Sequence, residues 1–125
     1  NLNGLPGLRV QHITEDAEGN ILIATQENGF QISKGKQFLS MDEEDGLPNL
    51  QVWDICAIND SLDLMATNNG IAQIQFYSDI QAKVTNVYNQ SNRKLISNNI
   101  RNLVRDNEGT IWISTALSGI QKYNV

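Results

Sequence analysis

The chain has 125 residues with a formal net charge of -5, and 40% of its residues are hydrophobic and 18% charged. This length predicts one domain, and the scattered basic residues argue against a phosphate-neutralising stripe, so nucleic acid is not expected as a partner. The longest apolar runs fall far short of the roughly 20 residues that cross a bilayer, so we expect no direct membrane contact from this segment. Because it starts at Asn1 without Met, we expect a piece of a longer protein.

Short strands are predicted along the whole chain, in three similar units. In the first unit they are expected at residues 10–15, 21–25, about five residues from Gly29, and 36–41. In the second unit they are expected at 52–58, 62–67, about five residues from Gly70, and 82–88. In the third unit they are expected at 100–105, 111–115 and from Gly119, and the unit stops before a fourth strand.

The three units are copies of one another. The segment EDAEGNILIAT (15–25) returns as RDNEGTIWIST (105–115) and, less clearly, as AINDSLDLMAT (57–67). The aligned residues Val10, Val52 and Ile100 are 42 and 48 residues apart, within the range of about 40 to 50 that is typical of propeller blades. The sequence therefore predicts an all-β fold: a partial β-propeller of three four-stranded antiparallel blades, at roughly 4–45, 46–94 and 95–125, with the last blade incomplete.

One segment also fits a helix. In LISNNIRNLVRDN, the apolar residues Ile96, Ile100, Leu103 and Val104 recur at helical spacing. The aligned segments RVQHITED and QVWDICAIN are rich in residues that prefer strands, and repeats share one structure. We therefore predict a strand here as well.

The repeated residues have structural roles. Asp, Asn and Gly before the second strand suit a tight turn. In that strand Ile21, Ile23 and Thr25 are expected to face one way, and Leu22 and Ala24 the other. A small residue at the position of Ala24 recurs as Ala66 and Ser114, as close packing of neighbouring blades requires. The structural motif comprises Asp16, Gly19, Thr25, Gly29, Thr67, Gly70, Asp106, Gly109, Trp112, Thr115 and Gly119.

This pattern resembles the two-component regulator propeller repeat, GLP…V…I..D..G.lWIGT..GL..Y. It is matched by GLPGLRVQHITEDAEGNILIATQENGF and by ISNNIRNLVRDNEGTIWISTALSGIQKY. At the Trp position of this pattern, Trp112 keeps the aromatic residue, whereas Leu22 and Leu64 replace it. At the Tyr position, Tyr123 keeps the aromatic residue and Ser33 replaces it. The resemblance implies an extracytoplasmic, periplasmic location in the sensor region of bacterial histidine kinases, often hybrid ones. It also implies that the propeller senses an external ligand, often an oligosaccharide.

The first strands of propeller blades line a central channel, and ligands commonly bind at its mouth. Aligned residues at this mouth combine an aromatic ring with polar groups, which suits a sugar. The candidate ligand-binding residues are Arg9, Gln11, Gln51, Trp53, Asn99 and Arg101. The alternative interpretation is ordinary channel polarity, with Trp53 filling the core.

The sequence indicates no cofactor, no metal site and no catalytic residue. His12 lacks an evident nucleophile and is interpreted as a channel or blade residue. Cys56 lies in an apolar run and is expected to be a buried thiol. The acidic run at 42–46 is expected to be a solvated connection between blades, in preference to a Ca²⁺ site.

Two other functions stay open: a protein-interaction scaffold, and a propeller lyase of the streptogramin-lyase type. Three blades would also leave two apolar faces uncovered, because propellers close with about four to eight blades. We therefore expect these faces to pack against further blades of the parent protein or against a second copy, which would supply six blades in all.

Overall fold

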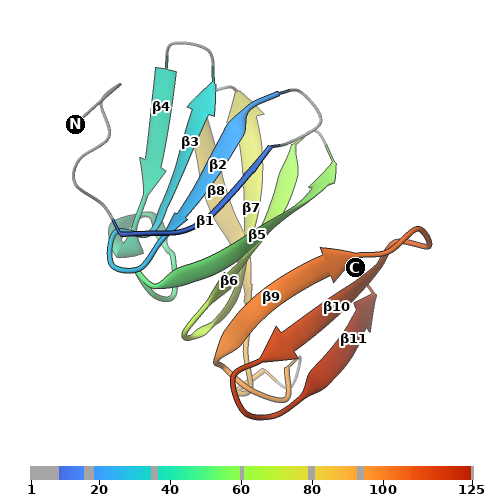
Figure 1. The fold of residues 1–125 in the computed structure, drawn as a ribbon. Helices are drawn as coiled ribbons and strands as arrows, with labels where there is room; N and C mark the ends of the chain where they lie inside the picture. Colours follow the sequence, from blue (N-terminus) through green and yellow to red (C-terminus); the bar gives the residue numbers. More distant parts are fainter. Residues whose placement is uncertain are drawn as a thin grey trace.

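The computed structural model describes residues 9–15, 19–34, 37–59, 61–78, 81–92 and 95–124. These residues form three antiparallel sheets, which Figure 1 shows following one another along the chain, from blue through green to red. Blade 1 contains β1 (Val10–Glu15), β2 (Ile21–Thr25), β3 (Phe30–Lys34) and β4 (Gln37–Met41). Blade 2 contains β5 (Val52–Asn59), β6 (Leu62–Thr67), β7 (Gly70–Ser78) and β8 (Gln81–Tyr88). Blade 3 contains β9 (Ile100–Arg105), β10 (Thr110–Thr115) and β11 (Ile120–Asn124).

The structure confirms the predicted all-β fold and partial propeller of three blades. Blades 1 and 2 are four-stranded, and blade 3 has three strands among the described residues. The segment with helical spacing forms strand β9, as the repeat predicted. β7 has nine residues where about five were expected, because it pairs along its length with the eight-residue β8. The predicted start of the fourth strand at residue 36 lies outside the described part of the chain.

Each sheet runs outward from its first strand. The strand order is β1-β2-β3-β4 in blade 1 and β5-β6-β7-β8 in blade 2, so neighbours in sequence are neighbours in the sheet. The first strands lie next to one another, β1 beside β5 and β5 beside β9. Helical structure in the described residues is limited to the single 3-10 turn η2 (Glu43–Asp45) between β4 and β5. No described helix has the length and apolarity to span a membrane.

Two apolar clusters hold the three blades together. The cluster between blades 1 and 2 contains Leu22, Ala24, Phe30, Ile32, Met41, Leu47, Val52, Ile55, Met65, Ala72, Ile74 and Phe76. The cluster between blades 2 and 3 contains Cys56, Leu64, Ala66, Ile71, Leu95, Ile100, Leu103, Ile111 and Ile113. Burial of this apolar surface is the main force that stacks the sheets.

The repeat also fixes which side of each strand meets which neighbour. Leu22 and Ala24 of β2 share one side of the strand, as predicted, and the structure shows that this side faces blade 2; the aligned Leu64 and Ala66 of β6 face blade 3. Between them in β6, Met65 points back toward blade 1. Both alanines are fully buried, so a larger side chain at either position would separate the sheets.

The repeated Thr and Gly close the turn after the second strand in every blade. The Thr25 hydroxyl donates to the Gly29 carbonyl oxygen at 2.8 Å, and its oxygen accepts the backbone N–H of Asn28 at 2.9 Å. In blade 2, Thr67 makes the same bond to the carbonyl oxygen of Gly70. Blade 3 repeats it between Thr115 and Gly119. A short polar side chain that bonds its own turn explains why Thr recurs here.

The backbone conformation requires glycine at all three turns, and close contact with the fourth strand is a second reason at two of them. Gly29, Gly70 and Gly119 have φ of +77°, +102° and +83°, a left-handed conformation that other residues rarely adopt. A Cβ at Gly29 or Gly70 would in addition collide with a backbone carbonyl of the fourth strand, that of Met41 or Tyr88. A Cβ at Gly119 would meet nothing within 4 Å.

Two of these glycines, Gly29 and Gly70, also link successive blades through the main chain. The N–H of Gly29 donates to the carbonyl oxygen of Leu50 at 2.9 Å, and the N–H of Gly70 donates to that of Asn98 at 2.7 Å. Each acceptor lies shortly before the first strand of the next blade. The chain that enters a blade is therefore fixed to the turn of the blade before it.

Candidate functional site

Two of the predicted ligand-binding residues, Trp53 and Arg101, come together where β5 and β9 lie side by side. The Arg101 guanidinium carbon is 4.0 Å from the centroid of the Trp53 ring. The side-chain oxygen of Asn68 accepts both the indole N–H of Trp53 at 2.8 Å and an N–H of Arg101 at 2.9 Å. Trp53 and Arg101 are each half-buried, and this trio joins blade 2 to blade 3. We call Trp53, Asn68 and Arg101 the interblade trio.

The trio includes a side-chain pair whose aligned counterpart is also hydrogen-bonded in blade 1. In blade 1, Gln26 donates to the side-chain oxygen of Gln11 at 3.0 Å, and these positions align with Asn68 and Trp53. In blade 3 the residue aligned with Asn68 is Ala116, which has no polar side-chain atom. Arg101 instead reaches the Asn68 oxygen of the neighbouring blade.

The other three predicted residues stand at the entrance to the first strands. The carbonyl oxygens of Arg9, Gln51 and Asn99 accept the N–H of the residue after the repeated Thr, at 2.9, 3.2 and 3.0 Å. These bonds hold the entering chain at the same place in all three blades. The Arg9 side chain approaches Glu27 at 4.0 Å, and both side chains are more than 70% exposed, so this ion pair contributes little.

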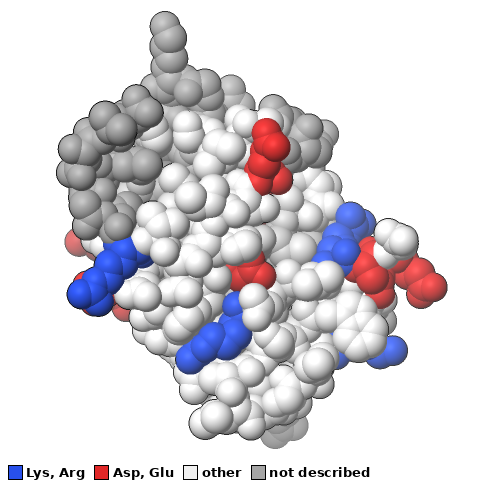
Figure 2. Space-filling model, in the orientation of Figure 1, with Lys and Arg blue, Asp and Glu red and all other residues white. Residues whose placement is uncertain are grey.

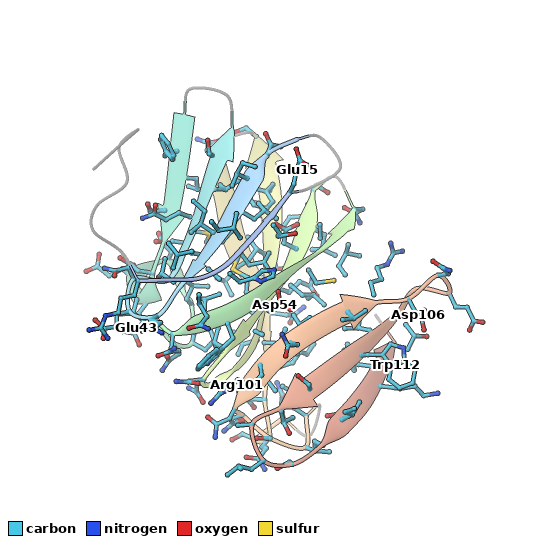
Figure 3. The ribbon with its side chains drawn as sticks, in the orientation of Figure 1. Glu15, Glu43, Asp54, Arg101, Asp106 and Trp112 are labelled. Atoms are coloured by element: carbon cyan, nitrogen blue, oxygen red, sulfur yellow. The ribbon has the colours of Figure 1, made fainter. Side chains whose placement is uncertain are left out.

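Asp54 is the residue that the sequence interpretation missed. One carboxylate oxygen accepts the backbone N–H of Leu103 in β9 at 2.9 Å, and the other accepts that of Ile55 at 2.9 Å. The His12 ring nitrogen Nε2 lies 3.2 Å from this second oxygen. Asp54 is buried. Because its contacts come from β1, β5 and β9, one carboxylate connects the first strands of all three blades; Figure 3 shows its place on β5.

A signal for Asp54 was present in the repeat. His12, Asp54 and Asn102 are aligned residues, and Asp54 is an acid inside the apolar strand VWDICAIN. A carboxylate among apolar residues must find hydrogen-bond donors when it is buried. The prediction that His12 is a channel or blade residue agrees with its contact to Asp54.

Burial also determines the state of the free cysteine. Cys56 is buried in the cluster between blades 2 and 3, as predicted. Burial, followed by the nearby Asp54 carboxylate, raises the pKa of the Cys56 thiol above its ordinary value. A thiol held in the neutral form is a poor nucleophile.

Asp106 organises the turn of the repeated motif in blade 3. One carboxylate oxygen accepts the N–H groups of Glu108 and Thr110 at 2.9 and 3.0 Å, and the other accepts the indole N–H of Trp112 at 2.9 Å. The bond from Trp112, then those from the two backbone N–H groups, lower the pKa of the Asp106 carboxyl. Figure 3 shows Asp106 and Trp112 together at the β9–β10 turn.

The matching turns of blades 1 and 3 share a left-handed glycine. Gly109 in blade 3 has φ of +85°, and Gly19 in blade 1 has φ of +84°. Asp16 lies outside the described residues.

The acidic run at 42–46 forms an exposed connection between blades 1 and 2. Its carboxylates bond the turn itself: Asp42 accepts the N–H of Glu44 at 2.8 Å, and Asp45 accepts the N–H of Asp42 at 3.0 Å. Within the described ranges, no three His, Cys, Asp or Glu side chains lie close enough to hold a metal ion. In the view of Figure 2, acidic and basic side chains are scattered in small groups, some of them next to one another.

Residues 94–116 match the family model described as the two component regulator propeller. This segment is therefore similar to one two-component regulator propeller repeat. This confirms the resemblance that the repeated motif indicated, and the match covers the β9–β10 hairpin with Asp106 and Trp112. None of the curated proteins matches the chain.

Solved structures share the fold of these propeller repeats. The extracellular domain assigned to the hybrid two component system BT3049 of B. thetaiotaomicron superposes with a TM-score of 0.74 at 24% identity, over 93% of this chain and 16% of that one. The extracellular domain assigned to the one component system BT4673 of the same organism gives a TM-score of 0.76 at 22% identity, over 93% and 17%. The chain thus spans less than a fifth of either neighbour.

Proposed function

We propose that this chain is a non-catalytic, ligand-sensing part of the extracytoplasmic region of a bacterial two-component sensor. Its ligand is an oligosaccharide or another small polar molecule, bound at the interblade trio of Trp53, Asn68 and Arg101. The observation that carries the proposal is the contact of an indole ring with a guanidinium group across two blades, both half-exposed. Aromatic rings and multiple N–H donors are the groups that orient polar ligands in protein sites.

The geometry suggests how binding affects the blades. Arg101 covers a face of the Trp53 ring, and Trp53 also packs against the apolar cluster between blades 2 and 3. A sugar hydroxyl accepts N–H groups of Arg101, or the sugar ring takes the place of the guanidinium over the indole. The second event breaks the bond between Arg101 and Asn68 and so removes a link between two blades. A ligand that favours one of these arrangements shifts the population of the sensor.

The comparisons support this proposal at the level of the domain. Residues 94–116 match the repeat of two-component regulator propellers, and the fold is that of extracellular domains assigned to a hybrid two component system and to a one component system of B. thetaiotaomicron. Trp53 and Arg101 of the proposed site lie on the first strands β5 and β9, at positions where a ligand was expected from the sequence, and Asn68 lies in the turn after β6. The proposed extracytoplasmic location follows from the same likeness.

Thermal unfolding of the chain with a panel of neutral and acidic oligosaccharides tests the proposal. At least one sugar should raise the unfolding temperature, because a ligand that binds the folded state stabilises it. Trp53→Ala should weaken binding of that sugar by more than about 1 kcal/mol, as expected for a central aromatic contact. Trp112→Ala is the matched control, because Trp112 also lies near a cation, Lys122 at 5.2 Å, but on a different surface.

Two results would contradict the proposal. One is the absence of any shift across the panel. The other is equal loss of binding in Trp53→Ala and Trp112→Ala, since only the first residue belongs to the trio. The lyase and scaffold functions gain no specific support from the trio, because it contains no general base and is partly covered by its own blades.

A further inference from the structure

The turns after the second strands of blades 1 and 2 each place an asparagine directly before the repeated glycine. Asn28–Gly29 and Asn69–Gly70 occupy the same position in the two blades. Both asparagines are exposed, whereas both glycines are buried. Asparagine is among the chemically labile residues of proteins, and a following glycine has no Cβ to keep the side-chain amide away from the main chain. At these two dipeptides the main chain can therefore react with the adjacent side chain.

The turn itself does not require asparagine at this position. In blade 3 the aligned residue is Ser118. Its N–H donates to the hydroxyl oxygen of the repeated Thr at 2.8 Å, as the N–H of Asn28 does in blade 1 at 2.9 Å and that of Asn69 in blade 2 at 3.0 Å. What blades 1 and 2 add at this position is a reactive amide.

The nitrogen that attacks such an amide is held by the next blade. The N–H of Gly29 donates to the carbonyl oxygen of Leu50 at 2.9 Å, and the N–H of Gly70 donates to that of Asn98 at 2.7 Å. Attack requires the glycine nitrogen to lose its proton and to approach the side-chain carbon, so this bond must first break. The contact between neighbouring blades therefore protects each asparagine.

We propose that Asn28 and Asn69 are sites of spontaneous deamidation, each exposed to reaction when its blade separates from the next one. In the opened turn the glycine nitrogen loses its proton and bonds to the asparagine Cγ, and ammonia leaves. Water then opens the cyclic imide at one carbonyl to give aspartate, or at the other to give isoaspartate. The reaction consumes water, releases ammonia and needs no oxidant or enzyme.

The isoaspartate product prevents the original contact from forming again. Its main chain passes through the side-chain carbon, so the turn becomes longer and gains a carboxylate. Neither turn has room for this change, because even an added Cβ would collide with the Met41 carbonyl at Gly29 or with the Tyr88 carbonyl at Gly70. Each separation of the blades that leads to reaction therefore weakens their join permanently.

Peptide mapping by mass spectrometry, after incubation in mildly alkaline buffer with and without urea, tests the proposal. Trypsin places the two dipeptides in separate peptides, residues 10–34 and 37–83. Because the reaction proceeds through an opened state, both sites should react more slowly in the native protein than in urea, by about tenfold or more. Equal rates with and without urea at either site would overturn the proposal.

Two core variants test which contact protects which site. Ile113→Ala removes packing between blades 2 and 3, so it should accelerate the reaction of Asn69 and leave that of Asn28 nearly unchanged. Ile32→Ala loosens blades 1 and 2 and should have the reverse effect. Circular dichroism shows whether each variant folds, and the milder Ile→Val change replaces an Ala variant that does not. Equal acceleration of both sites in both variants would overturn the proposal, because the reaction would then follow unfolding of the whole chain.

The double variant Asn28→Ser and Asn69→Ser is the matched control, since it copies Ser118 of blade 3. During an incubation that lowers the unfolding temperature of the wild type, the double variant should keep its unfolding temperature. An equal fall in both proteins would show that deamidation does not weaken the join between blades.

Discussion

The carboxylate of Asp54 accepts the backbone N–H of Leu103 at 2.9 Å, so a side chain of the second blade provides the hydrogen-bond acceptor for a backbone N–H in the first strand of the third blade. The same carboxylate contacts His12 of the first blade. A buried acceptor bonded to N–H groups of two sheets, and in contact with a side chain of the third, couples their stability.

Asp54→Ala should therefore be strongly destabilising. It leaves the buried N–H of Leu103 without its acceptor, which costs about 1–3 kcal/mol. Urea unfolding at one fixed protein concentration measures the change. Asn102→Ala changes the aligned position in β9, where the side chain is exposed, and should cost no more than about 0.5 kcal/mol. Equal effects of the two substitutions would show that Asp54 does not join the blades.

Substitution of the turn glycines should separate two causes of strain. Gly119→Ala introduces a left-handed Ala with open space around its Cβ, at a cost of about 1–2 kcal/mol. Gly29→Ala has the same backbone strain and also a collision with the Met41 carbonyl, so it should cost more by about 1 kcal/mol or above. Thermal unfolding of both variants gives the difference directly. Equal losses of stability in Gly29→Ala and Gly119→Ala would contradict this prediction, because they would mean that β4 shifts away from the added Cβ without cost.

A double-mutant cycle should detect the contact between Trp53 and Arg101. Trp53→Leu, Arg101→Met and the double variant should give a coupling of about 0.5–1 kcal/mol or more, because the cation lies over a half-buried ring. The matching cycle with Trp112 and Lys122 should give a smaller coupling, since that pair is 5.2 Å apart and exposed. Chemical unfolding supplies both values. A coupling of zero in the first cycle would remove the structural basis of the interblade trio.

The turn at Asp106 should make stability depend on acid pH. Its pKa is lowered in the folded state below the ordinary value of 3.8. The stabilisation is therefore present above about pH 4 and is lost as the pH falls through the lowered pKa. Asp106→Ala should flatten the fall in stability between about pH 5 and pH 2, and Trp112→Phe, which removes the largest cause, should flatten it in part. An unchanged profile in both variants would contradict this assignment.

The repeat explains how much could be predicted. The strands followed from the alignment of three copies, and the common side of Leu22 and Ala24 followed from the alternation of side chains along a strand. The role of Asp54 could not be predicted, because its partners Leu103 and His12 lie on other sheets and the sequence does not place them beside it. The partner of Arg101 was hidden for a related reason. Ala116 removes the acceptor in its own blade, and only the structure shows that Asn68 replaces it.

The bonds from Gly29 to Leu50 and from Gly70 to Asn98 use main-chain atoms alone. These two bonds between blades therefore depend on no side chain, and it is the left-handed backbone of the turn that requires the donor to be glycine. A gene segment encoding one blade can be duplicated or exchanged, and its product already carries both halves of this join. The inner positions can then diverge, as Gln11, Trp53 and Arg101 have, while the main-chain bond between neighbouring blades is kept.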